Sequence, residues 1–247
     1  MNRTAMTVLA AFALSATAAY AQDAENEVEE SSASTMPGWT EEAVGWTPLA
    51  IGLATPVQLP WGLNRWDVFG LDANLFYTDT PKMYGIGAGG LAMTTRNTAI
   101  GLVASGLANI ALEDVYGLRA TFGLEYAAKT VYGADIGLVG FRNRLYGCDA
   151  ALLGSFQRNV CGLQVCGLAS VSTVESYGVN IAGIANFAKT AYGVQLAIGL
   201  NMTEELHGAQ IAIVNYTELC PGGFQIGLIN IIMQNKWPVL PIVNWFF

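Results

Sequence analysis

Ten polar or charged residues recur at regular intervals among apolar ones and are the strongest candidates for a functional site. They share one face of an alternating pattern, in which every second side chain points to the same side of an extended strand. The ten are Asp72, Arg119, Glu125, Asp135, Asp149, Gln164, Asn180, Gln195, Gln210 and Gln225. Such side chains either line a water-filled passage for a small solute or ion, or satisfy one another across strands. The sequence leaves both alternatives open.

Other reactive residue types occur without the partners that catalysis needs. The single histidine, His207, stands where related segments carry tyrosine, and no G-x-S-x-G nucleophile motif is present. The four cysteines, Cys148, Cys161, Cys166 and Cys220, show no C-x-x-C spacing, so we expect no zinc site. They form disulfides if the chain is exported, or else act as small apolar fillers. We therefore expect no enzyme, with no catalytic residue, cofactor or metal.

A glycine-rich segment resembles a phosphate-binding loop. The run Gly85-Ile-Gly-Ala-Gly-Gly90 matches G-x-G-x-x-G. That pattern binds a dinucleotide only where it follows a strand and opens a helix. Here it lies inside a segment that alternates as a strand, so we interpret it as part of that strand.

A repeat of about 15 residues positions all of these side chains. Its consensus is aromatic-Gly-aliphatic-Gln-aliphatic-small-aliphatic-x-Asn, as in the unit that begins Tyr192-Gly193-Val194. Within a unit the apolar and the small or polar residues alternate, which predicts an all-β fold. The marker glycines of the units are Gly70, Gly85, Gly101, Gly117, Gly133, Gly147, Gly162, Gly178, Gly193, Gly208 and Gly223.

Neighbouring strands are expected to run antiparallel. Alternation persists for about 11 residues in Tyr116–Tyr126, or roughly 36 Å of extended chain. The four or five residues that remain are too few for a parallel connection, which needs about a dozen. We therefore predict an antiparallel up-and-down β-barrel of about 12 strands, closed by Asn244–Phe247, whose terminal Phe is typical of outer-membrane barrels. The alternative is a β-solenoid with one coil per repeat. Short connections and the prolines Pro238 and Pro241 favour this alternative.

The N-terminal part of the chain has a different composition from the repeat. Residues 1–21 combine Arg3, an apolar stretch and Ala19-Tyr20-Ala21, which together predict a secretory signal peptide. Residues 22–45 hold seven acidic residues and no Lys or Arg, so we expect an acidic disordered tail. Residues 46–247 then form the repeat β-domain. The tail carries most of the net charge of −8, and without a basic patch we expect no nucleic-acid partner.

The repeat resembles a known family. Units such as His207-Gly-Ala-Gln-Ile-Ala-Ile-Val-Asn215 are similar to the leptospiral-type tandem surface repeat of exported proteins from two-membrane bacteria. Trp66–Leu71 and Trp237–Phe247 are similar to the flanks of that family. The resemblance covers roughly residues 46–247. It implies a location in the cell envelope and brings no known activity or site residue.

These observations together predict a non-enzymatic protein of the outer membrane or the cell surface. A narrow channel or an envelope structural protein is the first hypothesis, with outer-membrane lipid as partner and a small solute or ion as cargo. The alternative is a surface or periplasmic β-solenoid used for adhesion or scaffolding. The 53% content of hydrophobic residues fits either hypothesis, because such a chain must bury its apolar surface or present it to lipid.

Overall fold

Every regular element of the computed structural model is a β-strand within the residues that it describes, which are 43–55, 57–61 and 65–246. No helix in this described part is long and apolar enough to cross a membrane. The predicted signal peptide and residues 22–42 of the predicted tail lie outside the described residues. The first strand, β1, begins at Gly45, one residue before the predicted start of the repeat domain.

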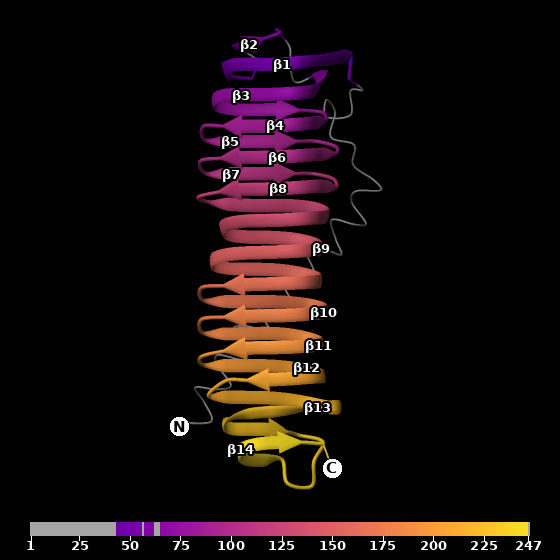
Figure 1. Cartoon of the computed structure of the whole chain (residues 1–247), viewed down its shortest axis with the longest axis vertical. Coiled ribbons are helices and arrows are strands. Elements are labelled where there is room, and N and C mark those ends of the chain that lie inside the picture. The colour runs from indigo at the N-terminus through magenta and orange to yellow at the C-terminus, as the bar shows by residue number, and fades with distance from the viewer. Residues whose placement is uncertain (1–42, 56, 62–64, 247) are drawn as a thin grey trace, which may run out of the picture. The chain divides into compact units, whose positions relative to one another are not determined.

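The strands follow one another with short connections along the whole repeat region (Figure 1). The first seven are β1 (Gly45–Ala54), β2 (Val57–Leu59), β3 (Trp66–Thr80), β4 (Met83–Gly89), β5 (Ala92–Thr95), β6 (Ala99–Ser105) and β7 (Ala108–Ala111). The last seven are β8 (Val115–Thr121), β9 (Leu124–Cys166), β10 (Ala169–Ala182), β11 (Ala185–Ala197), β12 (Leu200–Ile211), β13 (Val214–Ile232) and β14 (Val239–Trp245).

Successive repeats lie parallel and in register, so the predicted antiparallel barrel is wrong and the fold is a β-solenoid. Gly85 in β4 pairs with Gly70 in β3 and with Gly101 in β6. The same parallel register joins β9 to β10, β10 to β11, β11 to β12 and β12 to β13. Each repeat is one coil stacked on the preceding coil (Figure 1).

The barrel prediction failed because the chain changes direction within each unit, whereas we expected one straight strand. From β4 to β8 each coil is divided into two short strands, while the 43 residues of β9 continue through several coils. The strand β8 ends at Thr121, the chain turns at Phe122-Gly123, and β9 begins at Leu124. The side chains of Thr121 and Glu125 are both buried on either side of this turn. These two residues are four positions apart, an even number, so the period-two alternation continues through the turn. The turn therefore cannot be recognised in the sequence. The second strand of each coil carries the chain back, so no separate return segment is needed.

The marker glycines allow adjacent coils to approach closely. Gly117 has a φ of 137°, a conformation that side-chain-bearing residues rarely adopt. A Cβ atom at this position would lie 2.0 Å from the carbonyl oxygen of Gly101 in the preceding coil. The same contact recurs at each marker from Gly85 onward. Glycine therefore sets the phase of the repeat.

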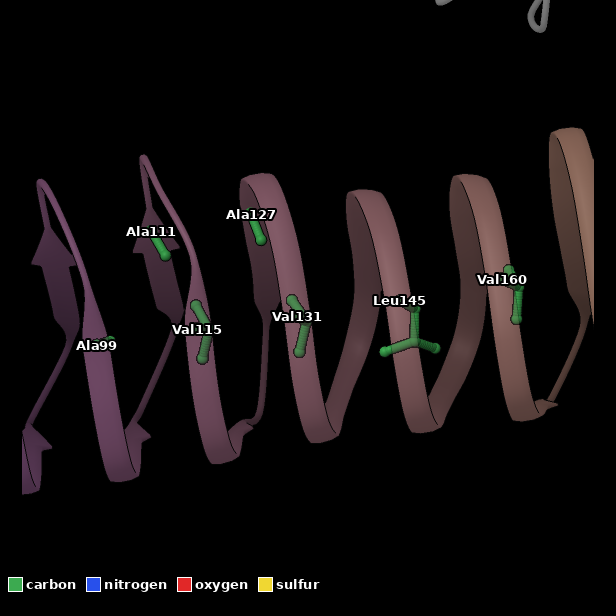
Figure 2. Packing of buried hydrophobic residues seen from close by; sticks show 7 residues of the cluster. All are labelled: Ala99, Ala111, Val115, Ala127, Val131, Leu145 and Val160. Atoms are coloured by element: carbon green, nitrogen blue, oxygen red, sulfur yellow. The ribbon is translucent and has the colours of Figure 1, made fainter.

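A column of apolar side chains fills the interior beside the first strand of each coil. Val115, Val131, Leu145 and Val160 come from successive coils and are at most 2% exposed. Figure 2 shows them on successive coils, from left to right across the view. Each apolar residue is covered by its counterparts in the adjacent coils, which removes it from water.

Antiparallel strands lie at both ends of the described stack. At one end β2 pairs antiparallel with β1, and at the other β14 pairs antiparallel with β13. Pro238 precedes β14, and Pro241 lies at an irregularity in its register. Proline is tolerated at such edge and bulge positions because no ladder hydrogen bond is lost there.

Candidate functional site

All ten polar residues singled out in the sequence lie inside the coils. Each of them, from Asp72 near one end to Gln225 near the other, is at most 2% exposed. The passage inferred for them depended on the barrel, and a barrel is not the fold. Their interior position makes hydrogen bonding with one another, coil to coil, the chemistry that is open to them.

Glutamines form one ladder through the later coils. Gln225 donates from Nε2 to Oε1 of Gln210 at 2.8 Å, and Gln210 donates in the same way to Gln195 at 2.9 Å. Gln210 also donates to Thr203 Oγ1 at 3.0 Å. Gln164 is fully buried without a side-chain hydrogen bond, so the ladder does not extend evenly through every coil.

Asparagines form a second, parallel ladder. Asn186, Asn201 and Asn215 each donate from Nδ2 to the next asparagine Oδ1, at 2.9, 3.0 and 2.8 Å, ending at Asn230. Ser170 donates to Asn186 Oδ1 at 2.6 Å and extends the ladder by one coil. The recurring Asn of the consensus carried this signal, since it repeats in phase with the marker glycine.

A cluster of buried charges occupies the middle of the stack. Arg119 donates to both carboxylate oxygens of Asp135, at 2.9 Å from Nε and 2.5 Å from Nη2. Arg142 also binds Asp135 and lies 2.9 Å from Asp149 Oδ1 through Nη2. Glu125 accepts from Asn109 at 3.0 Å and lies 3.5 Å from Arg119. Asn109 and Arg142 were missed in the sequence, because only a three-dimensional register brings them to this cluster.

Three carboxylates face two guanidinium groups in this cluster, and their pKa values diverge accordingly. Burial raises the pKa of Glu125 to about 7, although Arg119 acts to lower it. Burial also raises the pKa of Asp149, opposed by Arg142. At Asp135 burial acts in the same sense, but Arg119 and Arg142 outweigh it and lower the pKa to about 2. One proton held near Glu125 therefore makes the cluster close to neutral.

A separate buried carboxylate lies near the start of the stack. Asp72 accepts from Asn74 Nδ2 at 2.8 Å and from Thr78 Oγ1 at 3.0 Å. Burial raises its pKa to about 6, although both hydrogen bonds act to lower it. No cationic side chain contributes to this shift, in contrast to the charge cluster.

The cysteines and the histidine take structural positions. All four cysteines are free, with Cys148 and Cys161 exposed and Cys166 and Cys220 buried. Cys220 packs in an apolar cluster and belongs to β13. Among the described residues no group of His, Cys, Asp and Glu is arranged to hold a metal ion. The glycine-rich run at Gly85 belongs largely to β4.

Aromatic side chains stack along the outside of the coils, one residue before most of the marker glycines; Ile100, Cys161 and Gly222 interrupt the stack. Ring centroids lie 4.9 Å apart for Tyr116 and Tyr132, and 4.5 Å apart for Tyr177 and Tyr192. His207 continues the stack on Tyr192 at 4.5 Å, and its Nε2 lies 2.9 Å from Glu205 Oε1. We call this column of side chains the aromatic row.

The two edges of each coil differ sharply in polarity. In every coil except that of Gly133, a large apolar side chain that is 44–88% exposed lies five or six residues after the marker glycine. We call these residues the tip row: Leu75, Leu91, Leu107, Phe122, Leu152, Leu168, Ile184, Ile198, Ile213 and Leu228. From Gly85 onward, and leaving aside the buried Arg142, the opposite turn carries charges three to five residues before the marker glycine. We call these the charged edge: Lys82, Arg96, Glu113, Asp114, Lys129, Arg144, Arg158, Glu175, Lys189, Glu204, Glu205 and Glu218.

Comparisons of the chain with family models, with curated proteins and with solved structures found no match. The fold and the site define a class of protein on their own. This class is a tandem-repeat parallel β-solenoid with a hydrogen-bonded polar interior and an apolar outer face.

Proposed function

We propose that the chain is an exported, non-enzymatic scaffold or adhesive protein of the bacterial envelope, located at the cell surface or in the periplasm. One observation carries this proposal. The polar and charged side chains that could do chemistry are buried inside the coils, while the surface presents the same rows of side chains in coil after coil. A periodic surface suits binding to an extended or repetitive structure. The resemblance to exported surface repeats supports the same location.

The buried charge cluster supports a structural role for the interior. Arg142 is 0% exposed and Asp135 is 1% exposed, so neither is accessible to a substrate from outside. Their ion pairs join residues of three successive coils. Removing one partner would leave an uncompensated buried charge, which is strongly destabilising. The cluster therefore fixes the register of the coils.

The export part of the proposal is tested by fractionating a two-membrane bacterium that expresses the full chain. We expect a shortened protein, cleaved after Ala21, in the envelope or periplasmic fraction. A variant that lacks residues 2–21 is the control and should stay in the cytoplasm. Full-length protein in the cytoplasm of cells that express the intact gene would contradict export.

The adhesive or scaffolding part is tested on the same cells. Cells that export the chain should attach to surfaces or to one another more strongly than cells that express the control lacking residues 2–21. Antibody labelling of unpermeabilised cells separates display at the cell surface from a periplasmic location. Unchanged attachment together with an unchanged envelope, measured by sensitivity to detergent, would contradict the proposal.

A further inference from the structure

The outer face of the marker-glycine strands changes steadily in polarity from one edge to the other. The charged edge comes first, followed by the aromatic row. Two rows of aliphatic or small side chains come next, one and three residues after each marker glycine, as Leu118 and Ala120 do after Gly117. The tip row completes the gradient. From Gly70 to Gly223 no charged or amide side chain occupies either of the two middle rows.

These apolar rows remain open to solvent in the part of the chain that the structure describes. Side chains within a ladder cover one another from above and below, yet Ile86, Leu102 and Ile136 are 49–51% exposed. The tips are more exposed still, with Phe122 at 88% and Ile198 at 71%. At the coil spacing of roughly 4.8 Å, the rows extend for roughly 50 Å. Contiguous apolar surface on this scale marks an interaction site.

The backbone of the tip turns already has its hydrogen bonds. Leu107 N donates to Leu91 O at 2.7 Å, Ile184 N donates to Leu168 O at 2.8 Å, and Ile213 N donates to Ile198 O at 3.1 Å. The turns at the charged edge are paired in the same way, as Arg96 N is to Thr80 O at 3.0 Å, so this pairing follows from the stacking of the coils. In hydrocarbon each unpaired amide costs several kcal/mol, so turns can enter it only when they are paired in this way.

We propose that the tip row and the two adjoining aliphatic rows bind a lipid bilayer, with the tips in the acyl region and the charged edge in water. The aromatic row then lies between them at the depth where tyrosine is enriched in membrane proteins. The chain lies on the membrane and does not span it. This inference rests on the proposed envelope location.

A bilayer fits these rows better than a second protein does. The tips form a convex ridge without polar side chains, whereas protein interfaces combine an apolar centre with a hydrogen-bonding rim. The charged edge carries both signs, for example Lys189 beside Glu204 in the next coil, so attraction to anionic headgroups is not the driving force. The driving force is the burial of apolar surface, and binding should therefore be insensitive to salt.

Flotation of the purified full-length chain with phosphatidylcholine vesicles tests the proposal. We expect co-flotation that persists at high salt. The variant Phe122→Ser/Leu152→Ser/Ile198→Ser/Leu228→Ser should bind at least about tenfold more weakly, since each side chain contributes buried apolar area. The control Lys129→Ser/Lys189→Ser/Glu204→Ser/Glu218→Ser keeps the net charge and should bind as the parent does. Equal binding by both variants would overturn the proposal.

Single tryptophan substitutions test the orientation of the coils on the bilayer. This test does not require that the fourfold serine variant folds. Phe122→Trp places an indole at the most exposed tip, and Lys129→Trp places one on the charged edge. With brominated lipids, the fluorescence of Phe122→Trp should be quenched beyond that of the parent, and that of Lys129→Trp should not.

Sedimentation velocity without lipid tests the competing occupant, which is a second copy of the chain. A dimer that the tip variant dissociates, together with no vesicle binding, would replace the bilayer by self-association. Because the vesicle assay uses purified protein, its failure leaves the attachment of whole cells to be judged separately.

Discussion

Single glycines determine whether adjacent coils can stack. We expect Gly117→Ala to destabilise the fold by at least about 2 kcal/mol, because φ is 137° and the new Cβ would lie 2.0 Å from Gly101 O. Thermal unfolding followed by circular dichroism should show a midpoint roughly 4–8 °C lower.

Gly222→Ala provides the matched control for this substitution. A Cβ at Gly222 would meet no atom within 4 Å, so the unfolding midpoint should stay near that of the parent. Equal midpoints for Gly117→Ala and Gly222→Ala would show that close packing of the marker glycines does not hold the coils together.

The protonation of Glu125 makes stability depend on pH. Its pKa is raised from 4.5 to about 7 in the folded chain, so the native state binds more protons than the unfolded state between these values. Stability from this group is therefore fully present below pH 4.5 and is lost as pH rises through 7, by about 3 kcal/mol at most. Asp72 acts in the same direction between 3.8 and about 6.

Urea unfolding at pH 5 and pH 8 measures this effect. The variant Glu125→Gln should lose much less stability between the two pH values than the parent does, since its amide mimics the protonated carboxyl. Glu113→Gln, on the charged edge, should behave as the parent does. A parent protein that is more stable at pH 8 than at pH 5 would contradict the assignment of the proton to Glu125.

The strands show which features of the fold the sequence could predict. Period-two alternation and the marker glycines identified the all-β class, the 15-residue unit and the residues that share a face, such as Arg119 and Glu125. The direction of pairing could not be read, because the turn at Phe122-Gly123 preserves the alternation on both sides. Contacts such as Arg142 with Asp135 depend on the register between coils, which the composition of a single unit does not encode.

The asparagine ladder joins elements that are distant in sequence. Asn201 donates to Gln195 O, Ile211 O and Asn215 Oδ1, and accepts from Asn186. We expect Asn201→Ala to cost about 2–4 kcal/mol, because it leaves several buried polar groups without a partner. Chemical unfolding measures the loss.

Asn97→Ala is the control for the ladder, since Asn97 lies half-buried in a turn. It should change stability by less than about 0.5 kcal/mol, as is usual for surface substitutions. If Asn201→Ala were equally mild, the ladder would be an incidental consequence of the register and would not be a source of cohesion.

At the scale of the described unit, β14 covers the end of the stack and prevents end-to-end association with other copies of the chain. A solenoid ends in unpaired backbone groups that recruit further strands unless they are covered. Here β14 pairs antiparallel with β13 and breaks the parallel register, while Pro241 and the positive φ of Ile242 distort its outer side. Both features make β14 a poor template for another parallel coil.

Deleting residues 239–247 should therefore expose the edge of β13 and cause end-to-end association that increases with protein concentration. Sedimentation velocity would detect the oligomers. The variant Trp245→Ala keeps the backbone of β14 but removes its large apolar side chain, so it should stay monomeric in the presence of mild detergent. Because the detergent covers the apolar rows and leaves the strand edges free, only association through the edge of β13 should survive it. If the deletion variant stays monomeric under these conditions, the pairing of β14 with β13 is not what prevents end-to-end association.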